Sequence, residues 1–557
     1  MRKILLLALA LWLSLPTLAH AGGGVVSSAD PRASEAGREI LRAGGSAADA
    51  QMAMMLVLTV VEPQSSGIGG GGFFVHHNGK TGAVETIDGR ETAPSATRPT
   101  HFLGADGKPM PFIQAFPGGI SVGVPGNIAL MAKVHAKWGK LPWAKLFEPA
   151  IRISEGGFQV TPLLATRLNQ LKKIWADFPQ AQAIYWQDGK PKAVGDTIKN
   201  PAFAALLRSV AKGGAKAFYS GANADAIIAA TAGSARNKAV ITRQDIASYR
   251  AKERSAVCST YRTYKLCGMG PPSSGATTVF QILGMIERFD MKALGKDDPK
   301  SWHIIAEAMR LAYADRETYL GDSDFVSVPV AGLLDKNYMA SRSALIAPTT
   351  SLAAYPAGTP PGAPKRTAAI SGEVSGTTHF VAADGAGNVA TMTSTIEGPF
   401  GSQLIANGYF LNNELTDFSF APEKDGAPVA NRPQAGKRPL SSMSPTLVYD
   451  AKGKLILALG SAGGKRIIMH VAKTLIGVLD FGLPAREAIA LPNLYFGGDA
   501  VLIESGTSLD AMRDKLAALG RTVVASDLGS KVNAIEWTAS GWRGAADPRS
   551  EGLALNE

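Results

Sequence analysis

The pattern of apolar and polar positions along the chain predicts helices that alternate with strands. An amphipathic pattern covers residues 34–61 and is interrupted at 44–45. Ser46 and Asp49 follow the interruption, and both are residue types that begin a helix. Further helices are expected at 149–155, 201–212 and 301–319, and a strand is expected at 73–77. This alternation indicates a mixed α/β (α+β) fold class.

Residues 347–376 are the clearest break in composition, because five prolines stand there among Ala, Thr, Ser and Gly. Such a segment is typical of a loop or linker. Directly after it, two strand-like segments are joined by a turn at 385–388. Further strands are expected at 444–448 and 455–459. The loop therefore leads directly into a core strand that begins at Thr377.

The first 21 residues have a basic start, an apolar run at 4–15 and a small-x-small end at 19–21. This arrangement is typical of a cleavable secretory signal peptide. A membrane anchor is the alternative, but it needs about 20 apolar residues, and Pro16 ends this run. We therefore expect a signal peptide at 1–21, no membrane span, and a periplasmic or secreted protein.

Composition narrows the function classes. The chain has 557 residues, of which 46% are hydrophobic, so a sizeable core is expected. The formal charge is 57 minus 46, or +11. The charges are not collected in Lys/Arg blocks, no stripe of aromatic and basic residues is present, and no zinc-finger spacing occurs. A solvated basic surface is therefore favoured over nucleic-acid binding.

The two cysteines, Cys258 and Cys267, flank a segment that is predicted to form a β-hairpin. In an oxidising compartment they could pair across the two strands. Two inert thiols are the alternative. A catalytic role is not expected, because neither cysteine stands in a His-bearing context.

Several familiar signatures are incomplete. The glycine run at 69–72 lacks the Lys-Ser/Thr of a phosphate-binding loop, and the eight histidines form no HExxH motif and no Cys/His cluster. The segment at 460–464 partly matches a serine-hydrolase elbow, but no Asp and His constellation accompanies it. We therefore expect no metal and no organic cofactor.

A Thr pair begins at Thr377, at the junction of the predicted loop and strand. Paired threonines are common in strands, so a structural role is one interpretation. A Thr at a chain start, however, can act as a nucleophile, because its free α-amine accepts the hydroxyl proton. Cleavage after Gly376 would create such a chain start.

Several short motifs occur in a fixed order along the chain. They are AlaGlyGlySerAlaAlaAspAla at 43–50, AspGlyArgGluThrAlaPro at 88–94, ProProSerSerGly at 271–275, AlaAspArg at 314–316, GlyThrThrHisPhe at 376–380, LeuAsnAsnGluLeuThrAspPheSer at 411–419, LysArgProLeuSerSerMetSerProThr at 437–446, GlySerAlaGlyGlyLysArgIle at 460–467 and AlaAspProArgSer at 546–550. Each is weak alone, but their combination and order are specific. From about residue 25 to its C-terminus, the chain resembles the γ-glutamyltranspeptidases.

The resemblance implies a four-layer αββα sandwich of the N-terminal nucleophile hydrolase type. It also implies self-cleavage between Gly376 and Thr377, which gives a large subunit of 22–376 and a small subunit of 377–557. The two subunits would form one catalytic domain, whereas the length alone suggests three or four domains or two large ones.

The resemblance assigns catalytic roles as well. Thr377 would attack a γ-glutamyl amide and form an ester, and Thr395 would hydrogen-bond this nucleophile. Gly463 and Gly464 would donate backbone N–H groups to the oxyanion, where loss of one donor costs on the order of 100-fold or more in rate. The alternatives are a strand Thr without a catalytic role and a pair of turn glycines.

A γ-glutamyl group is a zwitterion, so its α-carboxylate needs a cation. Arg90 matches the family's carboxylate-binding Arg, and a guanidinium can grip a carboxylate at two points. A surface ion pair with Glu91 is the alternative. Ser441 and Ser442 match the pair that adds hydroxyl donors to the same carboxylate, with a simple turn as the alternative.

The α-ammonium of the same group needs acids. Glu414 and Asp417 match the family's ammonium-binding acids, and a helix-capping pair is the alternative. Glu397 stands where many members carry Asn, and it adds another acceptor. The segment that follows Asp417 is of intermediate length and has no aromatic residue at 421–436. We therefore expect a short or incomplete lid and a more open acceptor side.

The resulting expectation is a self-processing γ-glutamyltransferase and glutathione hydrolase. Its substrates would be glutathione and other γ-glutamyl compounds. Water would complete hydrolysis, and amino-acid or peptide acceptors would complete transfer. Two alternatives remain: a homologous cephalosporin or glutaryl acylase, and a non-catalytic periplasmic peptide binder, which would stay uncut.

Overall fold

The centre of the molecule is formed by two antiparallel sheets in the computed structural model, which describes residues 23–368 and 376–557. The seven-stranded sheet has the order β24-β1-β11-β12-β2-β3-β8. Its strands are β1 (Val25–Ser28), β2 (Gly71–His77), β3 (Val84–Asp88), β8 (Lys252–Arg254), β11 (Thr377–Ala383), β12 (Val389–Thr395) and β24 (Leu553–Asn556). The six-stranded sheet has the order β23-β22-β18-β17-β10-β9. Its strands are β9 (Val257–Tyr261), β10 (Tyr264–Gly268), β17 (Thr446–Tyr449), β18 (Leu455–Gly460), β22 (Asn533–Thr538) and β23 (Gly541–Ala546).

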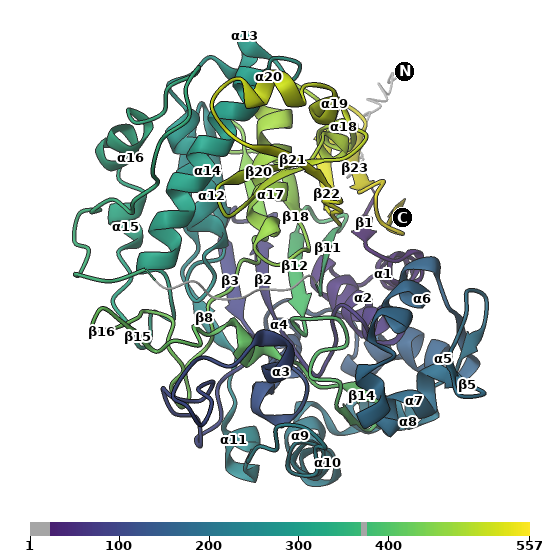
Figure 1. The fold of residues 1–557 in the computed structure, drawn as a ribbon. Coiled ribbons are helices and arrows are strands. Elements are labelled where there is room, and N and C mark those ends of the chain that lie inside the picture. The colour runs from purple at the N-terminus through teal and green to yellow at the C-terminus, as the bar shows by residue number, and fades with distance from the viewer. Residues whose placement is uncertain (1–22, 369–375) are drawn as a thin grey trace, which may run out of the picture.

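Helices surround these sheets (Figure 1). The first half of the chain contributes α1 (Pro31–Arg42), α2 (Ala47–Val61), α3 (Phe112–Ala115), α4 (Asn127–Trp138), α5 (Glu148–Gly156), α6 (Pro162–Leu171), α7 (Pro179–Tyr185), α8 (Pro201–Gly213), α9 (Ala215–Tyr219), α10 (Gly221–Ala232), α11 (Arg243–Ser248) and α12 (Gly275–Ile286). The rest contributes α13 (Met291–Leu294), α14 (Pro299–Tyr319), α15 (Val330–Leu333), α16 (Lys336–Ser343), α17 (Arg466–Leu479), α18 (Ala485–Ala490), α19 (Ser508–Ala511) and α20 (Arg513–Ala517). Short additional strands are β13 (Ile405–Ala406), β14 (Tyr409–Phe410), β15 (Glu423–Lys424), β16 (Ala427–Pro428), β19 (Leu494–Gly497), β20 (Ala500–Glu504) and β21 (Val523–Ser526).

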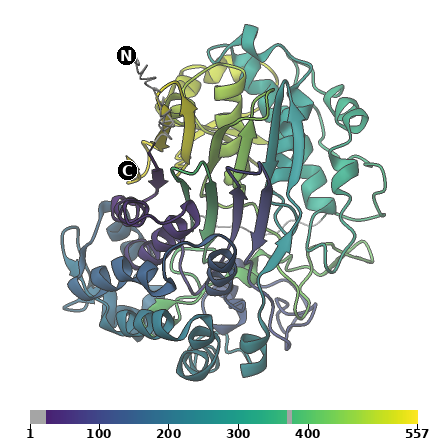
Figure 2. The same cartoon turned by 180° about the vertical axis from the view of Figure 1, so that it is seen from behind.

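The two sheets pack face to face between two helical layers. α2 packs on β11 and β12, whereas α12 and α17 cover the other sheet (Figures 1 and 2). Alternate side chains of the seven-stranded sheet face opposite ways, as expected for strands. Phe74 and Phe380 join the core around α2, and Phe73 and Val381 join the core between the sheets. The predicted αββα sandwich is confirmed.

Local sequence signals account for the elements next to the site. Ser46 and Asp49 form a capping box at the start of α2, with the Asp49 N–H 3.1 Å from Ser46 Oγ and the Ser46 N–H 3.0 Å from Asp49 Oδ2. The predicted helices at 149–155, 201–212 and 301–319 correspond to α5, α8 and α14. Strands β11 and β12 pair over their whole length. Of the predicted loop at 347–376, residues 369–375 lie outside the described residues, whereas 351–368 contain no helix or strand and Gly376 directly precedes β11.

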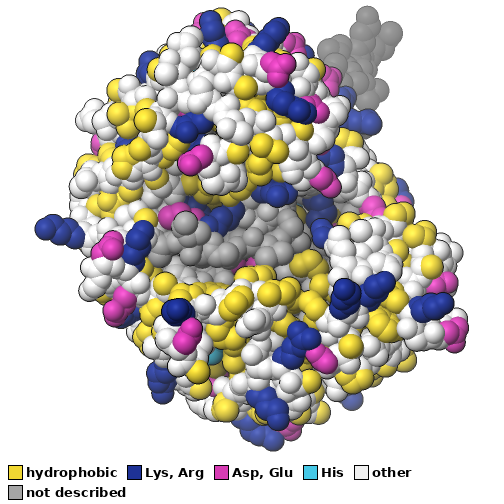
Figure 3. Space-filling view, viewed as in Figure 1, with side chains coloured by type: hydrophobic (Ala, Val, Ile, Leu, Met, Phe, Trp, Pro, Cys, Tyr) yellow, Lys and Arg dark blue, Asp and Glu magenta, His cyan; other side chains and the backbone are white. Residues whose placement is uncertain are grey.

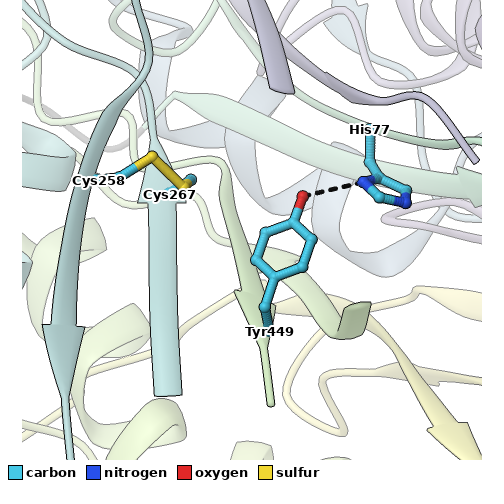
Figure 4. Close-up of a disulfide and its surroundings, with 4 residues drawn as sticks. All are labelled: His77, Cys258, Cys267 and Tyr449. Carbon is cyan, nitrogen blue, oxygen red and sulfur yellow. Dashed lines mark hydrogen bonds between the residues drawn. A yellow bond between two sulfur atoms is a disulfide. The ribbon is translucent and has the colours of Figure 1, made fainter. Parts of the chain in front are cut away.

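The two sheets are also connected through polar side chains at one end (Figure 4). His77, at the end of β2, lies 3.0 Å from the Tyr449 hydroxyl at the end of β17, measured from Nδ1. Nearby, Cys258 and Cys267 occupy directly opposed positions of the β9–β10 hairpin and form a disulfide. The predicted hairpin is therefore present, and its cysteines are paired.

Candidate active site

Thr377 and Thr395 face each other at the same end of the central hairpin. They are directly paired in the β11–β12 register, and their hydroxyl oxygens are 3.2 Å apart. The Thr395 hydroxyl also donates to the Gly376 carbonyl oxygen at 2.9 Å and accepts the Glu397 N–H at 2.8 Å. Both threonines are buried. The hydroxyl of Thr395 therefore contacts both the Thr377 hydroxyl and the carbonyl of the preceding peptide bond.

Gly376 occupies a position at which no larger residue fits. A Cβ atom there would lie 2.3 Å from the Glu397 carbonyl oxygen and 2.6 Å from the Gly398 carbonyl carbon. These neighbours are backbone atoms, so they cannot move aside as a flexible side chain could. The lack of a side chain lets the chain run close to the segment that follows β12.

Gly463 and Gly464 lie beside Thr377, in the turn between β18 and α17. Their φ angles are +134° and +59°, which glycine adopts more readily than other residues. Neither N–H group donates a hydrogen bond to an acceptor in the described ranges. This arrangement leaves two backbone donors at the start of a 14-residue helix, next to the Thr377 hydroxyl.

Arg90 is buried at the centre of a second group of residues. Its guanidinium forms ion pairs with Glu414 and with Asp417, the latter at 2.5 Å. It also donates to the carbonyl oxygens of Pro439 at 3.2 Å and Leu440 at 2.8 Å. Only 1% of the Arg90 side chain is exposed, so the alternative of a surface ion pair is wrong.

Burial and neighbouring charges together shift the pKa values of Arg90 and of the acids around it. Burial raises the pKa of Glu414 well above its ordinary value, although the Arg90 charge acts in the opposite direction. Burial likewise raises the pKa of Glu91 to about 7, and Arg90 again opposes the shift. Burial alone would lower the pKa of Arg90, but the charges of Glu414 and Asp417 raise it. One guanidinium thus holds several buried carboxyl groups.

Glu397 lies between the two groups of residues. Its φ angle is +74°, a left-handed conformation that is uncommon outside glycine. Its carboxylate accepts a hydrogen bond from the Asn413 side chain. Glu397 also lines a hollow of about 10 Å³, which we call the Arg90 pocket. The described residues that line this pocket are Arg90, Thr377, Thr395, Glu397, Glu414, Asp417, Ser441, Ser442, Met443, Gly464 and Ile467. All the predicted substrate-binding residues therefore meet at Thr377.

The Ser441-Ser442 pair is held in place by groups behind it. The Ser274 hydroxyl donates to the Ser441 carbonyl oxygen at 2.6 Å, and Arg316 donates to Ser274 Oγ at 2.9 Å. Arg316 also donates to Ser442 Oγ at 2.7 Å. Because Arg316 is fully buried, it fixes the orientation of these two segments from inside the molecule.

Sequence reasoning did not assign roles to Arg316, Glu91 or Asn413. A signal existed for Arg316, since it lies in a helix whose other residues are largely buried. Glu91 and Asn413 stand inside the motifs at 88–94 and 411–419, which could have drawn attention to them. The segment that was expected to form a short lid carries the β15–β16 hairpin, and none of residues 418–436 is among the described residues lining the Arg90 pocket.

Within 23–368 and 376–557, no group of three or more His, Cys, Asp or Glu residues is placed to hold a metal ion. No helix in those ranges is long and apolar enough to cross a membrane. The predicted signal peptide at 1–21 lies outside the described residues.

Comparisons with known proteins show the family to which the chain belongs. A family model described as gamma-glutamyltranspeptidase matches residues 33–556. The glutathione hydrolase proenzyme of Escherichia coli (strain K12) is 35% identical over 546 residues, covering 95% of this chain and 90% of that protein. A cephalosporin acylase from Bacillus halodurans has a TM-score of 0.84 and 26% identity over 99% of both chains. Helicobacter pylori gamma-glutamyltranspeptidase has a TM-score of 0.56 and 37% identity over 58% of this chain and 92% of that one. The chain described here belongs to the γ-glutamyltranspeptidase family.

Proposed function

We propose that this protein is an exported, self-processing γ-glutamyltransferase and glutathione hydrolase with Thr377 as its nucleophile. The observation that carries the proposal is the meeting of three features at Thr377. They are a hydroxyl partner in Thr395, two backbone N–H donors at 463–464, and the buried Arg90 pocket with its acids. Cleavage at Gly376–Thr377 would give chains of 22–376 and 377–557.

The hydrogen bond from Thr395 to the Gly376 carbonyl supports a role in this cleavage. A donor at that oxygen stabilises the negative charge that develops when a nucleophile attacks the carbonyl carbon. The adjacent Thr377 hydroxyl is the attacking group: its oxygen bonds to the Gly376 carbonyl carbon, the Gly376–Thr377 C–N bond breaks, and the nitrogen takes up the hydroxyl proton as the free α-amine of Thr377. Water would then hydrolyse the ester, which separates the two chains.

In the processed enzyme, the α-amine of Thr377 accepts the hydroxyl proton while the oxygen attacks the γ-amide. The N–H groups of Gly463 and Gly464 stabilise the tetrahedral oxyanion. The C–N bond then breaks, the amine leaves with the proton, and a γ-glutamyl ester remains. Water or an amine acceptor attacks this ester and regenerates Thr377.

The pairing of Arg90 with Glu414 and Asp417 explains why a zwitterion suits the pocket. A γ-glutamyl group brings one carboxylate and one ammonium. Its carboxylate can replace a protein carboxylate on Arg90, and its ammonium can then pair with the displaced acid. A glutaryl group brings no ammonium, so the displaced acid would remain buried without a partner, which is costly.

This argument separates the proposal from the acylase alternative. We expect kcat/KM for a γ-glutamyl anilide to exceed that for the matching glutaryl anilide by on the order of 100-fold, because an unpaired buried charge costs several kcal/mol. Equal rates, or a preference for the glutaryl compound, would favour the acylase.

The processing step is tested by N-terminal sequencing and intact mass of the purified protein. Two chains are expected, beginning at residue 22 and at Thr377. A Thr377→Ala variant should give one uncut chain without activity. A wild-type protein that stays uncut would support the peptide-binder alternative instead.

A further inference from the structure

A second hollow adjoins Thr377, and Arg90 is not among the described residues that line it. It has a volume of about 310 Å³, and Thr377 and Gly463 form part of its wall. Figure 3 shows Lys and Arg side chains spread over this face of the molecule among apolar and uncharged ones. We call this hollow the basic cavity, because its lining includes Arg167, Arg466, Lys531 and Arg549 but only one acid, Asp527.

Two of these four cations already have acidic partners. Lys531 pairs with Glu62 at 2.6 Å, and Arg549 pairs with Glu504 at 2.5 Å. Their charges are therefore largely balanced within the protein. They shape the wall of the cavity, but they offer little net charge to a ligand.

The other two cations are not balanced in this way. The Arg466 guanidinium makes no hydrogen bond or ion pair with any residue in the described ranges, and Arg167 donates only to the neutral side chain of Gln170, at 3.0 Å. Both side chains are half-buried. Asp527, the acid of the lining, is exposed. The cavity thus has an excess of positive charge close to the reacting Thr377.

Gln64 gives a second, independent indication of a ligand. Only 3% of this residue is exposed, and it lies on the wall of the basic cavity. Its side-chain carbonyl oxygen, Oε1, accepts no hydrogen bond from any part of the chain that the structure describes. Buried polar atoms are nearly always hydrogen-bonded, so a donor on a molecule that enters this cavity is the expected partner. An N–H group of an amino-acid or peptide amine component is such a donor, and the carboxylates of that component would face the two guanidinium groups.

The position of the cavity indicates which part of a substrate would enter it. The Arg90 pocket and the basic cavity meet at Thr377, so a γ-amide held for attack there has its acyl part in the first and its amine part in the second. From this geometry we propose that the basic cavity is a subsite for carboxylates on the amine component, either leaving group or acceptor, with Arg466 and Arg167 as the carboxylate ligands and Gln64 Oε1 as the acceptor of an N–H group of the same component. Two available cations favour amines that carry two carboxylates. The inference rests on the proposed γ-glutamyl chemistry.

Three substrates with increasing negative charge on the amine component test the subsite: γ-glutamyl-p-nitroanilide, γ-glutamylglycine and γ-glutamylglutamate. The wild-type KM should decrease along this series. In Arg466→Gln, the ratio of kcat/KM for γ-glutamylglutamate to that for the anilide should fall roughly tenfold or more, as for the loss of one charge-assisted hydrogen bond. Arg167→Gln should lower the same ratio, and Arg466→Lys should retain most of it.

Arg208→Gln is the matched control, since Arg208 is exposed and pairs with Glu155 outside the cavity. It should leave the ratio unchanged. Cleavage to two chains in each variant shows that the fold is intact. An unchanged ratio in Arg466→Gln and Arg167→Gln, or a wild-type KM that does not depend on carboxylates, would overturn the subsite. Failure of the wild type to hydrolyse any of the three substrates would instead overturn the proposed function.

Discussion

The two hollows that adjoin Thr377 differ in how their arginines are paired and in how much volume is open. In the Arg90 pocket, a buried guanidinium is already paired with Glu414 and Asp417, and almost no free volume remains. In the basic cavity, Arg466 has no partner in the described ranges and about 310 Å³ is open. A ligand must exchange charges in the first hollow, whereas it can simply add charge in the second. The Arg90 pocket should therefore discriminate between ligands and contribute to the stability of the fold. The basic cavity should tolerate both substitutions and a range of ligands.

The same substitution on the two sides gives the largest expected contrast. Arg90→Gln removes the partner of two buried carboxylates, so the free energy of unfolding should fall by about 3–5 kcal/mol. Arg466→Gln removes a half-buried, unpaired charge and should change it by less than about 0.5 kcal/mol. Urea unfolding of both variants, each in the Thr377→Ala background to keep the chain uncut, measures the difference. Equal losses of unfolding free energy in the two variants would show that the ion pairs of Arg90 do not stabilise the fold.

Processing should depend less on the charges of either hollow than on the Thr395 hydroxyl, in the wall of the Arg90 pocket. Thr395→Val keeps the shape of the side chain and removes the donor to the Gly376 carbonyl. We expect cleavage to slow on the order of 100-fold, the usual cost of one lost oxyanion donor. A time course of the appearance of the 377–557 chain on a denaturing gel measures it.

Thr393→Val is the control for that experiment, because the Thr393 hydroxyl lies on the same strand but bonds His379 at 2.9 Å. Thr395→Ser, which keeps the hydroxyl, should process at close to the wild-type rate. If Thr393→Val slows cleavage as much as Thr395→Val, the effect belongs to the strand and not to the scissile carbonyl.

A smaller effect is expected at the cleavage position itself. Gly376→Ala would place a Cβ atom 2.3 Å from the Glu397 carbonyl oxygen, and the backbone must shift to relieve this contact. Overpacking of this kind costs about 1–3 kcal/mol, and the shift should also move the carbonyl away from Thr395. Differential scanning calorimetry and the cleavage time course should both respond. Gly385→Ala, where no atom lies within 4 Å of the added Cβ, should change neither.

The elements that sequence patterns predicted correctly are those built from local signals. The capping box of Ser46 and Asp49 marks the start of α2, and the turn at 385–388 sets the register that pairs Thr377 with Thr395. Both depend on residues within about 20 positions of each other. Periodicity, capping and turn chemistry act at this range, so they can be read from one sequence.

The electrostatic arrangement of the site could not be predicted in this way. The motifs identified Arg90, Glu414 and Asp417, but not that these three side chains pair with one another across more than 300 positions. The basic cavity was even less predictable from the sequence, because its cations Arg167, Arg466 and Lys531 do not share a motif. Only the fold of both sheets and their helices brings them to Thr377.

A further prediction concerns the pH dependence of the buried acids around Arg90. The pKa of Glu91 is raised to about 7 by burial, against an ordinary value of 4.5. The folded protein therefore binds more protons than the unfolded chain between these two pH values, and stability must fall as the pH rises from 4.5 to 7. Glu91→Gln cannot ionise, so it should match the wild type near pH 4.5. By pH 8 it should be more stable than the wild type, because the wild type must ionise a buried carboxyl group there and the neutral amide need not. Unfolding midpoints measured from pH 4.5 to 8 give the comparison. A constant difference at all pH values would mean that Glu91 is not the titrating group, and that the Arg90 pocket balances its carboxyl groups in another way.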